Sequence, residues 1–67
     1  MQAQDRFRYE LIRHAAKRGE TADIGDLGLN EIEIRVARYA AGLIRSYSMN
    51  PDEAITKATP RVFSQQR

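Results

Sequence analysis

The segment from Asn30 to Ser48 constrains this chain most, because it is the one stretch long and regular enough to organise a fold of 67 residues. Read with a helical period, its apolar stripe has spacings of three and four and consists of Leu29, Ile32, Val36, Tyr39 and Leu43. A second stripe has the same spacing and consists of Glu31, Arg35, Arg38, Gly42 and Arg45. A helix of this kind packs on one side and meets an anionic partner on the other. The pattern therefore predicts a binding protein built around one central helix.

Capping signals indicate where the helices begin. Asn30 is followed three residues later by Glu33, the pattern of a capping box, in which each side chain bonds the backbone N–H of the other residue. Asn50, Pro51 and Glu53 repeat this pattern before a third segment, and Pro60 is expected to end that segment. The sequence therefore predicts an all-α domain with three helices, at residues 5–18, 30–48 and 51–59.

A chain of this length forms one domain at most and buries a modest share of its surface. We expect residues 1–67 to be a single small helical domain, with Asp5 capping the first helix and residues 61–67 forming a flexible tail. Five apolar side chains are expected to be the least exposed: Leu11, Ile32, Val36, Leu43 and Ile55.

Self-association is the remaining way to stabilise so small a domain. The chain has no Cys and one His, which excludes disulfides, thiolate metal sites and multi-histidine sites within one chain. The apolar residues of the central helix also cover more than one face, and two short helices are not expected to cover both. We therefore predict a homodimer. Its interface, or a surface for another partner, is expected to consist of Ile32, Val36, Tyr39 and Leu43.

Residues 31–36 suggest an alternative fold. Polar and apolar residues alternate there with period two, as in a half-buried strand. A strand followed by two helices resembles a ribbon-helix-helix DNA-binding protein, a dimer whose paired strands enter the major groove. The resemblance implies that Glu31, Glu33 and Arg35 face the DNA. Two carboxylates in that position would repel phosphates, so the helical interpretation is preferred.

Charge is distributed unevenly along the chain. The formal net charge is +2, but the side-chain charges sum to +3 over residues 1–18, to −5 over residues 19–33 and to +4 over residues 34–67. Nine of the eleven basic residues are Arg, which suits bidentate contacts with phosphate or carboxylate. The residues expected to contact nucleic acid or another partner are Arg6, Arg13, Lys17, Arg35, Arg38 and Arg45.

Patterns typical of enzymes and membrane proteins are not found. His14 is the one conventional acid–base group at neutral pH, and no spacing links it to a nucleophile. Glycine-rich phosphate-binding motifs, a signal peptide and an apolar run of membrane-spanning length are also lacking. We expect a non-catalytic cytoplasmic protein with no cofactor, no metal, no small-molecule substrate and no membrane partner.

Two functional hypotheses remain. In the first, the chain is a small DNA-binding regulatory protein whose arginines contact phosphates, which the pI of about 9.4 favours. In the second, it is a protein-binding adaptor, inhibitor or antitoxin-like module that docks through the apolar face of its central helix. Its arginines would then meet an acidic protein surface, and the acidic middle segment favours this hypothesis.

Overall fold

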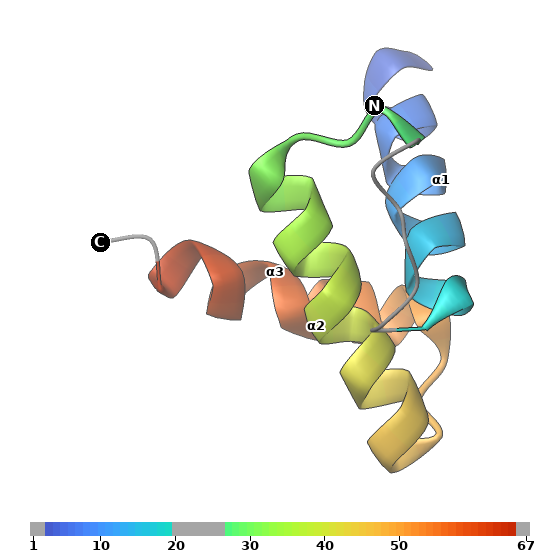
Figure 1. Cartoon of the computed structure of the whole chain (residues 1–67), viewed down its shortest axis with the longest axis vertical. Coiled ribbons are helices and arrows are strands. Elements are labelled where there is room, and N and C mark those ends of the chain that lie inside the picture. The colour runs from blue at the N-terminus through green and yellow to red at the C-terminus, as the bar shows by residue number, and fades with distance from the viewer. Residues whose placement is uncertain (1–2, 20–26, 66–67) are drawn as a thin grey trace.

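The computed structural model describes residues 3–19 and 27–65. They form three α-helices: α1 (Ala3–Arg18), α2 (Glu31–Tyr47) and α3 (Pro51–Ser64) (Figure 1). No strand occurs among these residues, so the all-α prediction is confirmed. The alternative prediction, a strand at residues 31–36 as in a ribbon-helix-helix protein, is wrong because these residues are helical. Alternating apolar residues suit a helix here because both flanks are covered. Ile32 packs against a cluster that includes α3 residues, and Ile34 packs against one that includes Ala15 of α1.

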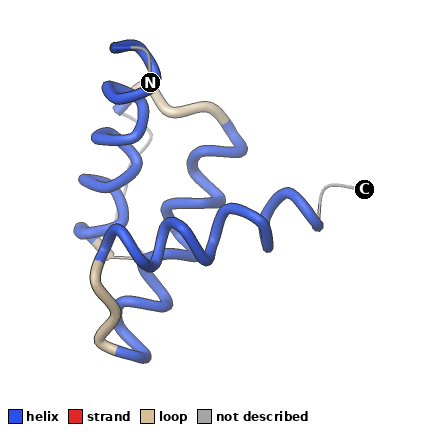
Figure 2. Tube along the Cα trace, turned by 180° about the vertical axis from the view of Figure 1, so that it is seen from behind, coloured by secondary structure: helices blue, strands red, loops and turns tan. Residues whose placement is uncertain are grey.

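Helix α2 is the central element of the fold. It runs beside α1 in the same direction, and α3 crosses it steeply on the far side in the view of Figure 1; Figure 2 shows the same crossing from behind. Because α1 and α2 are parallel, the C-terminal end of α1 and the N-terminal end of α2 lie at opposite ends of this helix pair. The acidic part of the connection between them, residues 20–26, lies outside the described residues.

The start of α2 is formed as predicted. The Glu33 N–H donates to the Asn30 side chain at 2.8 Å, and the Asn30 N–H donates to the Glu33 carboxylate at 2.9 Å. This reciprocal pair is the predicted capping box. Asn50 caps α3 by accepting from the backbone N–H two residues on, at 2.8 Å. Helix α1 differs from the prediction, because Ala3 is already helical and Asp5 therefore lies within the helix instead of capping it.

Alanine dominates the core. The buried apolar residues are Ala15, Ala16, Leu29, Val36, Ala37, Ala40, Ala41, Ala54, Ile55, Ala58 and Val62. Val36 and Ile55 were expected among the least exposed side chains and are each 4% exposed. Leu11, Ile32 and Leu43 were expected there as well but are only partly buried at the edges of the core. Alanine allows helices to approach closely, and the narrow space between them leaves larger side chains at the rim.

Helix α3 continues past Pro60 to Ser64. The prediction of a helix end at this proline, with a tail over residues 61–67, is therefore wrong for the part through Ser64. Proline within a helix removes one backbone hydrogen bond and crowds the preceding turn. Val62, which is 2% exposed, packs into the core just beyond it. Burial of that side chain offsets the cost of the proline and keeps the last turn helical.

This packing can be tested with two neighbouring residues of α3. Val62→Ala should lower the free energy of unfolding by about 2 kcal/mol, because it removes two buried methyl groups and leaves a cavity. Phe63 is 52% exposed, so Phe63→Ala should lower it by less than about 1 kcal/mol. Urea unfolding of both variants measures the difference. Small and equal effects would contradict the packing of the last turn of α3 against the core.

Candidate nucleic-acid interface

The basic residues of α1 divide into exposed and internally engaged groups. Arg6 and Lys17 are exposed. Arg13 is partly buried, and its Nε lies 3.2 Å from Asp52 Oδ1 at the start of α3, in an ion pair without hydrogen-bond geometry. The Tyr9 hydroxyl donates to the same oxygen at 2.6 Å. Arg13 therefore links α1 to α3 and is less accessible to a ligand than the sequence suggested.

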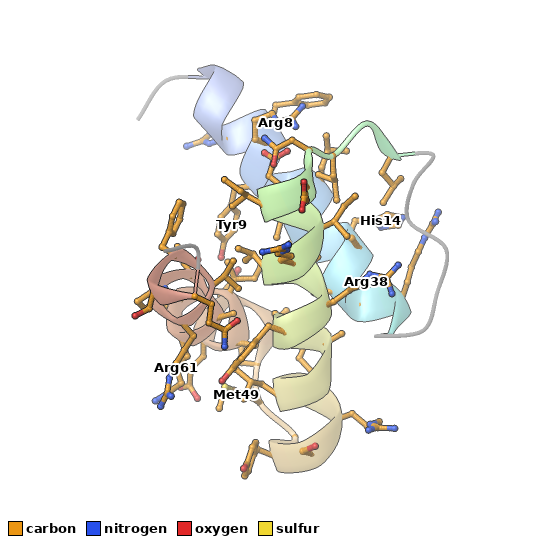
Figure 3. All side chains as sticks on the ribbon, turned by 60° about the vertical axis from the view of Figure 1, so that its left-hand side comes forward. Arg8, Tyr9, His14, Arg38, Met49 and Arg61 are labelled. Atoms are coloured by element: carbon orange, nitrogen blue, oxygen red, sulfur yellow. The ribbon has the colours of Figure 1, made fainter. Side chains whose placement is uncertain are left out.

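Arg8 forms a second link, which the sequence analysis missed. Its Nε donates to Glu33 Oε2 at 2.8 Å, its Nη2 donates to the Gly28 carbonyl at 3.2 Å, and Nη2 also donates to Glu33 Oε1. Figure 3 shows Arg8 beside the start of α2. Glu33 thus closes the cap of α2 and receives the guanidinium of α1. Twenty-five positions separate the two residues, and no local periodicity connects residues so far apart.

Both links shift the pKa of a participating group. Hydrogen bonds from Arg8 hold the pKa of the Glu33 carboxyl below its ordinary value; partial burial opposes this effect, and the Asn30 N–H adds to it. The hydrogen bond to Asp52 raises the pKa of the Tyr9 hydroxyl above its ordinary value. Each shift therefore has its main cause in a contact that positions α1 against the start of another helix.

The arginines of α2 lie on exposed positions of its outer side. Arg35, Arg38 and Arg45 are all exposed, and Figure 3 shows α2 in front of α1, with α3 to its left. Arg35 donates to Glu31, one turn earlier, at 2.9 Å. A shallow groove of about 280 Å³ follows the C-terminal half of this side. The residues that line this groove, which we call the α2 groove, are Arg38, Tyr39, Gly42, Leu43, Arg45, Ser46 and Tyr47.

The α2 groove has a cationic rim beside an aromatic and apolar wall. Gly42 has no side chain and lies one turn from Arg38, so the surface of the helix is recessed beside Arg38. Tyr39 and Leu43 are partly buried and pack against the core, which fixes their position. Tyr47 is 72% exposed. None of the described residues that line the groove is acidic, so this lining is suited to an anionic group with a flat apolar part beside it.

The four residues predicted for an interface have different environments. Val36 is buried between the helices and belongs to the core of its own chain, so a partner cannot reach it while the three helices are packed. Ile32, Tyr39 and Leu43 pack against that core but remain partly exposed. The burial of Val36 follows from its position in the middle of α2, where the other two helices cover the inner side.

Other kinds of site receive no support from the described residues. None of their His, Asp and Glu side chains form a group of three or more that could hold a metal ion, and no helix among them is long and apolar enough to cross a membrane. His14 is exposed on α1 (Figure 3). Comparisons with models of protein families, with curated proteins and with solved structures gave no match. Function is therefore inferred from the chemistry of the α2 groove.

The Arg8–Glu33 link should make stability depend on pH in acid. The folded pKa of Glu33 lies below the ordinary value of 4.5, so its stabilising contribution is complete above that pH and is lost as the pH falls through the folded pKa. The difference in free energy of unfolding between the parent and Glu33→Gln should therefore be largest near neutral pH and shrink below pH 4.5. Urea unfolding at a series of pH values measures this difference.

Arg8→Met provides the matched variant, because it leaves the carboxylate in place and removes its main hydrogen-bond donor. It should reduce the acid dependence that Glu33 contributes, leaving the part due to the Asn30 N–H. Parallel stability curves for the parent and both variants across the acid range would show that the link does not govern acid stability.

Proposed function

We propose that the protein is a small non-catalytic regulatory protein that binds nucleic acid through the outer side of α2. The observation that supports this proposal is the cationic rim of the α2 groove. Arg38 and Arg45 are seven residues apart, which is about two helical turns and about 10 Å along the axis. They therefore project from nearly the same side of α2 and can contact two phosphates of one backbone. Arginine suits this contact because its planar guanidinium binds phosphate oxygens in a bidentate manner.

Other basic residues contribute unequally to this proposal. Arg35 is exposed, and its pair with Glu31 is a surface ion pair of the kind that contributes under about 1 kcal/mol, so exchanging that partner for a phosphate costs little. Arg6 and Lys17 on α1 add positive charge that attracts an anionic polymer at longer range. Arg13 contributes least, because it is engaged with Asp52.

The protein-binding hypothesis ranks second. It relies on the apolar side of α2, and much of that side is used within the chain: Val36, Ala37, Ala40 and Ala41 are buried. What remains for an adaptor, inhibitor or antitoxin-like module is the partly exposed edge formed by Ile32, Tyr39 and Leu43. An acidic protein surface would meet the same arginines, so the rim alone does not separate the two partners.

The homodimer remains a prediction, and its predicted interface overlaps the α2 groove. Tyr39 and Leu43 belong to both the predicted dimer interface and the α2 groove. A dimer that buries them would close the groove, so self-association and nucleic-acid binding should compete. We expect sedimentation equilibrium at micromolar concentration to give a dimer that dissociates when an oligonucleotide is added. A monomer throughout this range, with or without oligonucleotide, would overturn the dimer and leave the groove open to ligand.

The nucleic-acid proposal predicts a specific effect of the two rim arginines. Arg38→Ala and Arg45→Ala should each weaken binding to random-sequence DNA, tested as a duplex and as a single strand. Each should reduce the slope of log K against log salt by about 0.7 to 0.9, the loss of one phosphate contact. The free energy of unfolding should change by less than about 1 kcal/mol, because both side chains are exposed.

Arg61→Ala is the matched control. Arg61 is an exposed arginine on α3, and in Figure 3 it points to the opposite side of the view from Arg38. This variant should bind like the parent. If the parent binds neither form of DNA at about 50 mM salt, or if all three variants bind alike, the nucleic-acid proposal is wrong.

A further inference from the structure

We infer that the α2 groove binds the unpaired bases of a single-stranded nucleic acid, with its arginines on the phosphates and Tyr47 stacked on a base. This inference rests on the proposed function and names the form of nucleic acid that the site takes. The first observation is Tyr47 itself. It is the last residue of α2, it lines the groove, and it is 72% exposed, the largest exposed fraction among the large apolar side chains of the described residues. An aromatic ring in this position is available for stacking.

The wall of the groove is arranged along the direction that a strand would follow. Tyr39 and Tyr47 are eight residues apart, about 12 Å along the helix axis, and Leu43 lies between them. Stacked nucleotides rise only about 3.4 Å each along one strand, so a strand that contacts both rings spans several nucleotides. Tyr39 and Leu43 are fixed by their packing on the core, whereas Tyr47 is largely exposed. Gly42 and Ser46 lie between the arginines and the side chains of Tyr39 and Leu43 on the helix surface, so a strand in the groove would meet the arginines on one side and the apolar side chains on the other.

Double-stranded DNA does not fit this wall. Within a duplex the faces of the bases are stacked on one another, and only their edges are accessible in the grooves. A ring such as that of Tyr47 would find no face to stack on. Single strands expose a face on every base, and proteins that bind them combine a positive track for the backbone with aromatic side chains for the bases. The lining of the α2 groove has both components.

An exposed acidic residue on the N-terminal half of α2 favours the same form. Glu31 lies on the stripe that carries the arginines, and its side chain is 80% exposed. A duplex lying along the whole helix would bring phosphates to this carboxylate, which would repel them. A single strand confined to the groove, between Arg38 and Tyr47, avoids it.

The experiment compares one labelled random-sequence DNA as a single strand and as a duplex, by fluorescence anisotropy at equal salt. The parent should bind the single strand more tightly. Tyr47→Ala should weaken single-strand binding roughly tenfold, the scale of one lost stacking contact, and should leave duplex binding almost unchanged. Tyr47→Phe should bind like the parent, because its ring still stacks. Phe63→Ala is the matched control, since it removes an exposed aromatic ring that does not line the groove, and it should also bind like the parent.

Tyrosine emission supplies a second measurement, because the chain has three Tyr and no Trp. Single-stranded DNA should quench the emission of the parent, and the quenching should be smaller in Tyr47→Phe although its affinity is kept. Preference for the duplex, or unchanged single-strand binding by Tyr47→Ala, would overturn this inference and leave the proposed function standing. Binding to neither form would overturn both. Binding to polyglutamate as tight as to the single strand would also overturn both, in favour of an acidic protein partner.

Discussion

Close packing through alanine is the constraint on which the rest of the structure depends. Seven of the eleven buried apolar residues are alanines contributed by all three helices. Alanine at a helix crossing allows the helix axes to approach to about 8 Å, the short end of the usual range. A chain this small has too few large side chains to fill a wider core. The bulkier residues of α2 are therefore displaced to the edges. Tyr39 and Leu43 become the fixed wall of the α2 groove for this reason.

Two polar links position α1 on this alanine core and decide which cations remain outside. Arg8 contacts the cap of α2, and Arg13 contacts the start of α3 together with Tyr9. Each link ties one basic residue of α1 to a carboxylate at the first turn of another helix, where the helix dipole also favours negative charge. Part of the positive charge of residues 1–18 is thereby used in folding. The arginines of α2 lie at exposed positions on the outer side of that helix.

Local patterns predicted the local features of this protein. The three helices, the capping box at Asn30 and the arginine stripe with Gly42 all follow from residues within a few positions of one another. Contacts between distant residues did not follow from such patterns, and Arg8 and Glu33 are the clearest case. Helix α3 continues past Pro60 because Val62 is buried in the core. The rule that proline ends a helix does not take this burial into account. The core was assigned to large side chains, because periodicity identifies the buried side of a helix but not how closely the next helix approaches.

At position 42, helix stability favours alanine, whereas an open α2 groove favours glycine. Glycine within a helix is about 1 kcal/mol less favourable than alanine, and alanine is the main core residue of this chain. Gly42 lines the α2 groove between Arg38 and Ser46, which lie one turn to either side, so a methyl group there would add bulk to this lining. The inner side of the same helix packs against both α1 and α3. A ligand that holds the C-terminal half of α2 in its folded form therefore stabilises all three helices together, and it raises the free energy of unfolding by RT ln(1 + L/Kd), where L is the concentration of free ligand.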